Sequence, residues 1–257
     1  MRATVIVLAL VGAAFSPLST VSGAVISYRD STHTVINATL LKVDAVQSGA
    51  FSEPLTDSLS NFNIPDNTGP ARWACSYVRQ AVGAPNINGT QITIAKDSTS
   101  KPFSCGELVY NKPAQYGIYS VDMISTNVRG HITGFFLIVN GVSEIDVELT
   151  GLNSTVVWLN VWKGSKQNPR KIPLGFDASL GFHTYQIEWR KDFIAWSVDG
   201  KQILKRSDIK TADPTKNSYR LALNSWTQAA DEDLWAGQFK WPGKPIHSQF
   251  RNLRYTP

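Results

Sequence analysis

The feature that most constrains the fold is a stretch of five residues, Glu144-Ile145-Asp146-Val147-Glu148, in which carboxylates alternate with β-branched apolar residues. Side chains of a β-strand alternate between two faces, so the pattern predicts a strand with acids on one face and apolar groups on the other. The apolar face can pack on a core. Carboxylates that repel one another on the opposite face lower the stability of the fold. Their presence together therefore suggests a functional role. We call this stretch the pentad.

The spacing of the outer two glutamates suggests such a purpose. At a rise of about 3.3 Å per residue, the Cα atoms of Glu144 and Glu148 lie roughly 13 Å apart, and side chains that lean inward by about 4 Å each leave roughly 5 Å between the carboxyl carbons. Retaining glycosidases hold their two catalytic carboxyl groups about 5–5.5 Å apart. The alternative interpretation is a solvated strand face that is merely acidic, and the pentad alone does not separate the two.

The rest of the chain favours an all-β domain. Its 257 residues can bury one sizeable core, and 42% apolar with 18% charged residues excludes a disordered chain or a coiled coil. Short apolar or alternating runs recur between Gly, Pro, Asn and Asp, which is typical of an antiparallel sandwich. Asp199-Gly200 is a strong hairpin-turn signal. Strands are expected at residues 91–95, 116–123, 134–139, 144–148, 156–162, 184–189, 193–198, 201–205, 220–226 and 248–255.

The strand at residues 156–162 is expected to lie beside the pentad. Its odd positions, Val157, Leu159 and Val161, are apolar and should face the core. Its even positions would form a polar and aromatic wall next to the acids, although a slip of one residue would turn that wall into the core. The members of this wall are Trp158, Asn160 and Trp162. Two further tryptophans, Trp189 and Trp196, are expected in the core.

The N-terminus is typical of a secretory signal peptide, which we place at residues 1–23. Arg2 supplies the positive start, an apolar run extends from Val5 to Phe15, and small residues precede the cleavage position. The run is too short for a stable membrane anchor, and no second long apolar run follows. We therefore expect a soluble, secreted protein that acts outside the cell or in a cell wall. Residues 24–70 are either a loose lead-in or early edge strands.

Export also bears on particular side chains. Cys75 and Cys105 are the two cysteines of the chain, and in an exported protein we expect them to form a disulfide. Acceptor sequences for N-glycosylation begin at Asn37, Asn88 and Asn153. The net charge of +5 is scattered, without a Lys or Arg run longer than two residues. Nucleic acid is therefore not an expected partner.

Several motifs together resemble glycoside hydrolase family 16, whose signature is Glu-x-Asp-x-Glu on one strand. Residues 174–185 resemble the stretch before the central hairpin of the lichenase-type members, and residues 194–200 resemble that hairpin. Residues 223–226, followed by 234–237, resemble the last cleft strand and its loop, and Cys105-Gly106-Glu107 resembles the Cys-x-Glu of the family. The resemblance covers roughly residues 70–257, so we place the catalytic domain at residues 71–257.

The resemblance implies a curved antiparallel β-jelly-roll sandwich with an open cleft on its concave face. It implies that Glu144 is the nucleophile, Asp146 a helper that orients it, and Glu148 the general acid/base of a retaining endo-β-glucanase. It also implies a β-glucan or related polysaccharide as substrate, no cofactor, and a monomer. The residues that we expect to contact substrate or support the site are Glu107, Asn160, Trp162, His183, Asn224, Trp226 and Trp235.

Departures from the family pattern leave alternatives open. Val109 stands where lichenases carry an arginine, and Val161 and Trp162 stand where they carry paired tyrosines, so mixed-linkage specificity is in doubt. A wall-remodelling transglycosylase would use the same carboxylates. A lectin-like module that binds glycan without cleaving it would be expected to lack a catalytic glutamate. Some family members hold a structural calcium ion on the convex side, and nothing in the sequence identifies such a site.

Overall fold

The computed structural model describes residues 26–29, 35–38, 49–97, 100–229 and 235–257, with the first two segments described as backbone only. The predicted signal peptide at residues 1–23 lies outside the described residues. Within the described part, the chain forms β-strands and one short 3₁₀ helix, Arg79–Ala81. The predicted all-β class is confirmed.

The strands match the predicted alternating runs closely and add several short ones. β1 (Ile26–Arg29) and β2 (Val35–Ala38) pair only with each other. The remaining strands are β3 (Phe51–Glu53), β4 (Phe62–Asn63), β5 (Cys75–Tyr77), β6 (Thr90–Lys96), β7 (Phe103–Tyr110), β8 (Gly117–Ile124), β9 (His131–Val139), β10 (Ser143–Thr150), β11 (Val156–Lys163), β12 (Lys166–Gln167), β13 (Arg170–Pro173), β14 (His183–Trp189), β15 (Ile194–Val198), β16 (Lys201–Arg206), β17 (Arg220–Thr227) and β18 (Ile246–Thr256).

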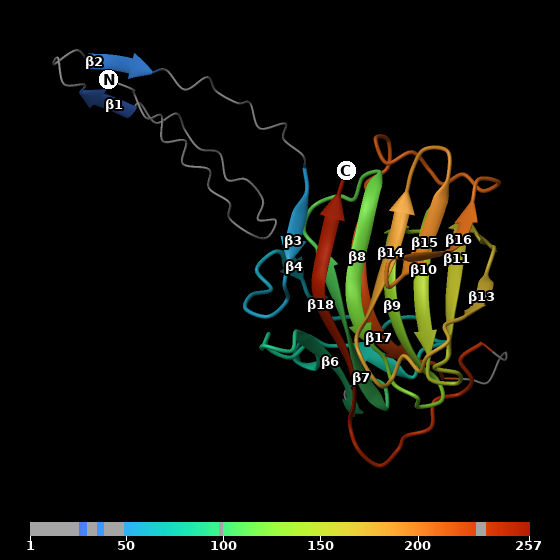
Figure 1. Cartoon of the computed structure of the whole chain (residues 1–257). Helices are drawn as coiled ribbons and strands as arrows, with labels where there is room; N and C mark the ends of the chain where they lie inside the picture. Colours follow the sequence, from blue (N-terminus) through green and yellow to red (C-terminus); the bar gives the residue numbers. More distant parts are fainter. Residues whose placement is uncertain (1–25, 30–34, 39–48, 98–99, 230–234) are drawn as a thin grey trace.

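The larger strands form one continuous sheet that curls into two facing layers (Figure 1). Its strand order is β12-β11-β10-β9-β17-β7-β6-β18-β8-β14-β15-β16, with β3, β4, β5 and β13 attached beside this path. Strands β11, β10, β9, β17 and β7 form one layer, and β18, β8, β14, β15 and β16 form the other. Pairing is antiparallel except between β5 and β7. This is the curved jelly-roll sandwich that the resemblance predicted.

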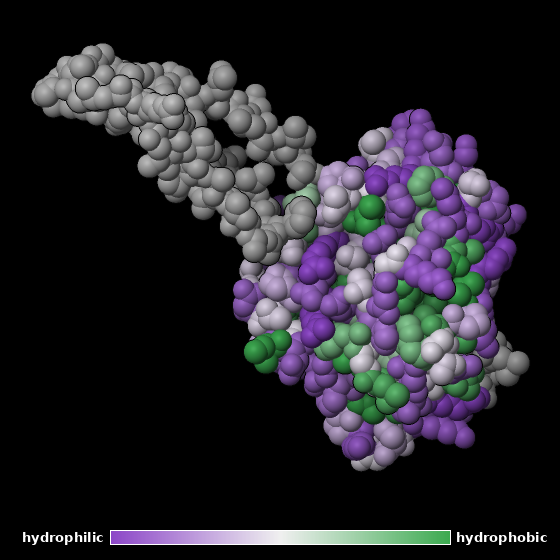
Figure 2. Space-filling model, viewed as in Figure 1, coloured by the Kyte–Doolittle hydropathy of each residue, from purple (hydrophilic) through white to green (hydrophobic). Residues whose placement is uncertain are grey.

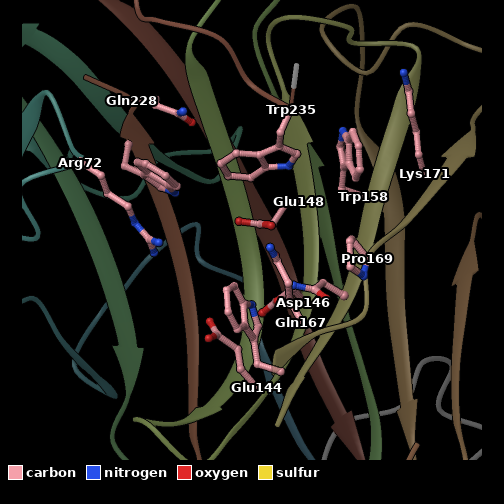
Figure 3. Close-up of a pocket in the computed structure, with 13 residues that line it drawn as sticks. Arg72, Glu144, Asp146, Glu148, Trp158, Gln167, Pro169, Lys171, Gln228 and Trp235 are labelled. Carbon is pink, nitrogen blue, oxygen red and sulfur yellow. The ribbon is translucent and has the colours of Figure 1, made fainter. Parts of the chain in front are cut away.

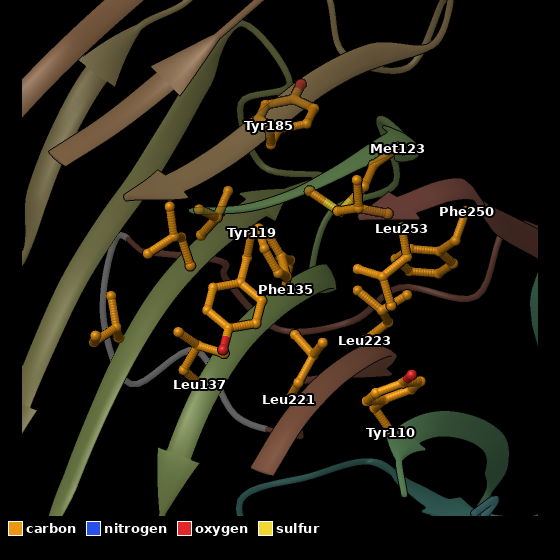
Figure 4. Close-up of a cluster of buried hydrophobic side chains, with 14 of the residues drawn as sticks. Tyr110, Tyr119, Met123, Phe135, Leu137, Tyr185, Leu221, Leu223, Phe250 and Leu253 are labelled. Carbon is orange, nitrogen blue, oxygen red and sulfur yellow. The ribbon is translucent and has the colours of Figure 1, made fainter. Parts of the chain in front are cut away.

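The core fills the space between the two layers (Figure 4). Phe135 and Leu137 of β9 and Leu221 and Leu223 of β17 point into it from one layer. The other layer contributes Tyr119, Val121, Met123 and Tyr185, among others. The predicted core positions of β11 are confirmed, because Val157, Leu159 and Val161 are buried here. Trp189 and Trp196 are also buried, as predicted.

Turn chemistry follows the sequence at the hairpin between β15 and β16. Asp199 and Gly200 both have positive φ values, 49° and 77°. A two-residue hairpin turn of this kind needs positive φ at both positions, which Asp and Gly tolerate better than most residues. The predicted hairpin is therefore confirmed. Across the view of Figure 2, the surface of the described residues is largely hydrophilic, with scattered hydrophobic patches.

The predicted disulfide is also present. Cys75 and Cys105 are bonded, with Cα atoms 5.7 Å apart, and both residues are fully buried. The bond fixes β5 to the N-terminal part of β7, with which it pairs. Short strands β3 and β4 pair with the edges of β18 and β7, so part of the segment before residue 70 belongs to the sandwich. No helix in the described residues is long and apolar enough to cross a membrane.

Candidate active site

The pentad lies in β10 and divides its side chains as the alternation predicts. Ile145, Val147 and the next odd residue, Leu149, are buried in the core between the layers. Glu144, Asp146 and Glu148 project from the opposite, concave face of the same layer. A strand between two paired neighbours is a rigid support, so the relative positions of the three carboxylates are fixed by the backbone.

The register of the sheet aligns the pentad with side chains on both neighbouring strands. On β11, Trp162 lies opposite Glu144, Asn160 opposite Asp146, and Trp158 opposite Glu148. The predicted wall of β11 is therefore correctly oriented, and no slip of register occurs. On the other side, β9 contributes no charged group to these rows: its residues opposite the three acids are Ile138, Phe136 and Gly134.

A cavity of about 480 Å³ opens over the three acids (Figure 3). In this view Trp235 lies above Glu148, Arg72 lies on one side of the cavity, and Trp158 and Lys171 lie on the other. The cavity is mainly aromatic and polar, which suits a sugar that has both apolar faces and hydroxyl groups. Its lining residues are Arg72, Glu144, Asp146, Glu148, Trp158, Asn160, Trp162, Gln167, Pro169, Lys171, Trp226, Gln228 and Trp235.

Burial sets the protonation of the pentad. Burial, reinforced by the charge of Glu144, raises the pKa of Glu148 to about 8. Burial also raises the pKa of Asp146 well above its usual range, and the neighbouring charges of Glu144 and Glu148 add to this effect. Burial raises the pKa of Glu144 as well, but a hydrogen bond from Asp146 and the charges of Arg72 and Arg220 oppose the increase. Glu144 is therefore the carboxylate best suited to carry the negative charge, whereas burial favours the protonated forms of Asp146 and Glu148.

Asp146 is the most enclosed of the three acids, with 3% of its surface exposed. A hydrogen bond from Asn160 favours its charged form, and the Asn160 side chain is itself held by the backbone N–H of Asn168 at 2.9 Å. The backbone carbonyl of Asp146 accepts a hydrogen bond of 3.1 Å from the indole N–H of Trp196, which belongs to the opposite layer. The centre of the pentad is thus anchored from two strands.

Aromatic rings continue from the cavity toward the disulfide. Trp235 packs near Trp226 with ring centroids 5.8 Å apart, and Trp226 packs on Trp73 at 5.0 Å. Trp73 in turn packs on Tyr77 at 4.8 Å. On the other side of the cavity, the Lys171 ammonium lies 5.8 Å from the Trp158 ring. Trp162, Trp226 and Trp235, which the sequence predicts as cleft residues, are all brought to the cavity.

Glu107 and Asn224 face the same side of the sheet but lie beneath other residues. Asn224 on β17 pairs with Glu107 on β7, and both are less than 10% exposed. The Asn224 amide donates a 2.8 Å hydrogen bond to the hydroxyl of Tyr77, which is also buried. Burial raises the pKa of Glu107 to about 7. These two residues therefore form a covered floor beside the main cavity instead of lining it.

Val109 lies on the same face and has apolar neighbours. It packs with Phe136 and Ala222 in a small cluster, in the row that crosses the sheet at Asp146. The row that starts at Asp146 therefore continues across the sheet with apolar side chains, first Phe136, then Ala222 and Val109. This is a direct structural consequence of the valine that the sequence carries in place of an arginine.

The structure does not bring His183 to this site. His183 begins β14 in the opposite layer, where its Nδ1 atom lies 2.7 Å from a carboxylate oxygen of Asp199. Its ring stacks on Phe176 with centroids 3.4 Å apart. The sequence argument failed because position next to a family hairpin does not show which layer of the sandwich the side chain faces.

Some residues of the cavity were not expected from the sequence. Arg72 precedes the disulfide, Gln228 follows β17, and Gln167, Pro169 and Lys171 belong to the short β12–β13 segment. None of these has a periodic pattern around it. The one available signal was the cysteine at position 75, since a disulfide to Cys105 brings residues near 72 toward the cleft.

The predicted N-glycosylation acceptors are not among the residues that line the cavity. Asn88 and Asn153 are exposed, as an N-glycosylation acceptor must be, and Asn37 lies in β2, whose side chains are not described. Among the described residues no group of three or more His, Cys, Asp or Glu side chains is arranged to hold a metal ion. On the layer away from the cleft, Asp122 is bonded by Thr184, Arg251 and Asn252, which does not fit a calcium ligand.

A jelly-roll sandwich with two glutamates of one strand in a tryptophan-lined cleft is typical of glycoside hydrolases. The family model for glycosyl hydrolases family 16 matches residues 70–243. The chain belongs to this family.

Known proteins resemble the chain in both sequence and structure. A β-glucanase of Brevibacillus brevis is 33% identical over 176 residues, which cover 65% of this chain and 66% of that protein. The solved structure of a Bacillus licheniformis β-glucanase superposes with a TM-score of 0.73 and 25% identity, covering 82% of this chain and 99% of the other. A transglycosylase solved in complex with NAG, at 20% identity and a TM-score of 0.59, covers 79% of this chain and 86% of its own, and shares the fold.

Proposed function

We propose that this protein is a secreted, retaining endo-β-glucanase in which Glu144 is the nucleophile, Glu148 the general acid/base and Asp146 the helper. The observation that carries the proposal is the arrangement of β10, where the three carboxylates share one cavity with Trp158, Trp162, Trp226 and Trp235. The similar β-glucanases support a glucan as substrate. The disulfide fits a protein that folds in an oxidising compartment outside the cytosol.

In the first step, a carboxylate oxygen of Glu144 forms a bond to the anomeric carbon while the bond from that carbon to the leaving oxygen breaks. Glu148 donates its proton to the leaving oxygen, which its raised pKa allows near neutral pH. In the second step Glu148, now ionised, takes a proton from water. The water oxygen bonds to the anomeric carbon, and Glu144 leaves as a carboxylate. Two inversions give overall retention.

Asp146 would act through its hydrogen bond to Glu144. A protonated Asp146 donates to the Glu144 carboxylate and so keeps the nucleophile both ionised and oriented. When Glu144 becomes an ester, this hydrogen bond weakens, because the acceptor loses its charge. The helper role therefore requires the protonated state that burial favours. The buried pair of Glu107 and Asn224 would support the floor beneath the neighbouring sugar.

The test uses two isosteric variants and a matched control. Glu144→Gln should lower the rate of β-glucan hydrolysis at least about 10³-fold, because it removes the nucleophile. Glu148→Gln should still react with an aryl β-glucoside whose leaving group needs no proton, and a glycosyl adduct on Glu144 should then accumulate in the intact mass spectrum. Glu188→Gln, on β14 of the opposite layer, is the control and should keep the wild-type rate. A Glu144→Gln variant that cleaves glucan at the wild-type rate would exclude this mechanism.

The transglycosylase alternative differs only in the acceptor of the second step. Four tryptophans around the cavity offer stacking surfaces that a sugar acceptor could occupy in place of water. Product analysis with a fluorescent oligosaccharide acceptor separates the two activities. Elongated labelled products identify transfer, and their absence during complete glucan breakdown identifies hydrolysis.

A further inference from the structure

Arg72 occupies a singular position in the candidate active site. It lines the cavity of about 480 Å³ over the pentad, and it also lines an adjoining cavity of about 190 Å³ beside Gly141 and Gly164. The other residues common to the two cavities are Glu144 and Trp162. The Arg72 side chain thus stands at the junction of the two spaces, and Figure 3 shows it extending toward the carboxylates from the side opposite Trp158.

The backbone that carries Arg72 is firmly held. The carbonyl of Arg72 accepts a 2.8 Å hydrogen bond from the N–H of Ala229, and the N–H of Ala74 donates to the carbonyl of Thr227 at 2.8 Å. The Lys101 ammonium donates to the carbonyl of Trp73 at 2.9 Å. These bonds, with the disulfide at Cys75 and the Trp73–Trp226 stack, join the segment to the end of β17. The backbone at Arg72 is therefore held in place, and its side chain lines both cavities.

We propose that Arg72 is a positioning residue that stabilises the negative charge of the pentad as this charge moves from Glu144 to Glu148 during the reaction. The inference rests on the proposed function. In the free enzyme Glu144 carries the charge and Glu148 the proton. In the glycosyl-enzyme Glu144 is a neutral ester, and Glu148, which has given its proton to the leaving oxygen, carries the charge. A cation that faces both groups stabilises both states without moving.

The electrostatics of the site agree with this geometry. The charge of Arg72 lowers the pKa of both Glu144 and Glu148, whereas that of Arg220 acts on Glu144 but is not among the influences on Glu148. Of the described cations, Arg72 is the one that lowers the pKa of both glutamates. Lys171, which also lines the cavity, lies beside the Trp158 ring. The titratable and charged groups that face the two glutamates or feel their charge are Asp146 on β10, Tyr77 on β5, Glu107 on β7, Lys171 on β13, Arg220 on β17 and Arg72 itself.

The test compares the pH dependence of kcat/KM on soluble β-glucan in the wild type, Arg72→Met, Arg72→Gln and Arg72→Lys. Removing the cation should move both limbs of the profile to higher pH by at least about half a pH unit, because a nearby positive charge favours the ionised form of a carboxyl group. Arg72→Lys keeps the positive charge, so its profile should remain close to that of the wild type. Arg254→Met removes an exposed arginine from β18 in the opposite layer and should leave the profile unchanged.

A second readout needs no substrate. Titration of the glutamate side-chain carboxyl groups by ¹³C NMR in the wild type and Arg72→Met measures the same two groups directly. Wild-type titration curves in Arg72→Met would overturn the inference, as would a shift that Arg72→Lys fails to reverse, because the latter indicates lost packing instead of lost charge. If the wild type cleaves no β-glucan but the NMR shift is present, the proposed function fails and the electrostatic role of Arg72 stands.

Discussion

Gly134 offers the sharpest test of how the floor of the site is built. It lies on β9 in the row between Glu148 on β10 and Asn224 on β17. A Cβ atom at this position would lie 2.4 Å from Oδ1 of Asn224, closer than real Cβ contacts come. The side chain of Asn224 therefore lies directly over the glycine. A Gly134→Ala substitution must push that amide away from its present place.

The cost follows from the bond that the amide would lose. Oδ1 of Asn224 is buried without a hydrogen-bond partner, so moving it sacrifices nothing at that atom. The amide nitrogen, however, would leave the Tyr77 hydroxyl at 2.8 Å, and an unsatisfied buried group costs about 1–3 kcal/mol. Replacing Gly by Ala within a strand recovers about 0.5–1 kcal/mol. The net loss in the free energy of unfolding is about 1–2 kcal/mol, which lowers the Tm by about 3–6 °C.

A double-mutant cycle isolates this effect. Gly134→Ala should destabilise the wild type in urea and thermal unfolding, but should be neutral or slightly stabilising when Asn224→Ala has already removed the obstructing oxygen. The coupling free energy between the two sites should then be about 1–3 kcal/mol, the cost of the displaced amide. Equal losses in both backgrounds would show that Asn224 does not cover Gly134, and a Gly134→Ala variant more stable than the wild type would refute the whole argument.

Three further predictions concern protonation and the disulfide. Because the pKa of Glu148 is raised to about 8, the rate of hydrolysis of unactivated glucan should fall as pH rises through about 8. With an aryl substrate whose leaving group needs no proton, the rate of the first step should not fall in this way. Burial lowers the pKa of His131 to about 3 from 6.5, so its contribution to folding is complete above pH 6.5 and is lost as pH falls toward 3. His131→Gln should therefore flatten the stability curve in this window, by up to about 4–5 kcal/mol, in urea unfolding across pH; parallel curves would contradict it. Replacing Cys75 and Cys105 by serine together should reduce the free energy of unfolding by about 3–4 kcal/mol relative to the oxidised wild type, and the reduced wild type should match the double variant.

Alternation along the strands was the most reliable guide from sequence to structure. The stretches at 143–150 and 156–163 each place one face in a dry core and the other in a cleft, so their side chains alternate and both faces could be assigned. β7 is different. Nearly all of Phe103–Tyr110 is buried, because one face lies on the core and Tyr77 with the disulfide covers part of the other. A strand that is buried on both faces loses its alternation and was not predicted.

The remaining parts of the site depend on contacts between distant segments. Glu107 was expected to contact substrate from the family resemblance, and Asn224 because it shares a strand face with Trp226. Nothing in the local sequence indicates that the Tyr77 hydroxyl accepts a hydrogen bond from Asn224. Arg72 and Lys171 come from segments without a period, and tertiary contacts alone bring them to the cavity. His183 was expected to support the site because its motif resembles a family sequence next to the central hairpin. That motif belongs to β14, which pairs with β8 in the layer opposite the cleft.

Three carboxylates on one strand face are tolerable in this fold because they do not all ionise. Burial raises the pKa of Asp146 and of Glu148 and so favours their protonated forms, which lowers the total negative charge of the pentad. In the mechanism proposed above this total stays constant: Glu144 gives up the charge as it forms the ester, and Glu148 takes it up as it releases the proton. The surroundings, with Arg72 on one side and the anchored Asp146 between, need not reorganise when the charge moves along the strand. Fixed groups that suit both the start and the end of this movement lower the barrier without a cost in reorganisation, which gives the alternation of the pentad a catalytic reason as well as a structural one.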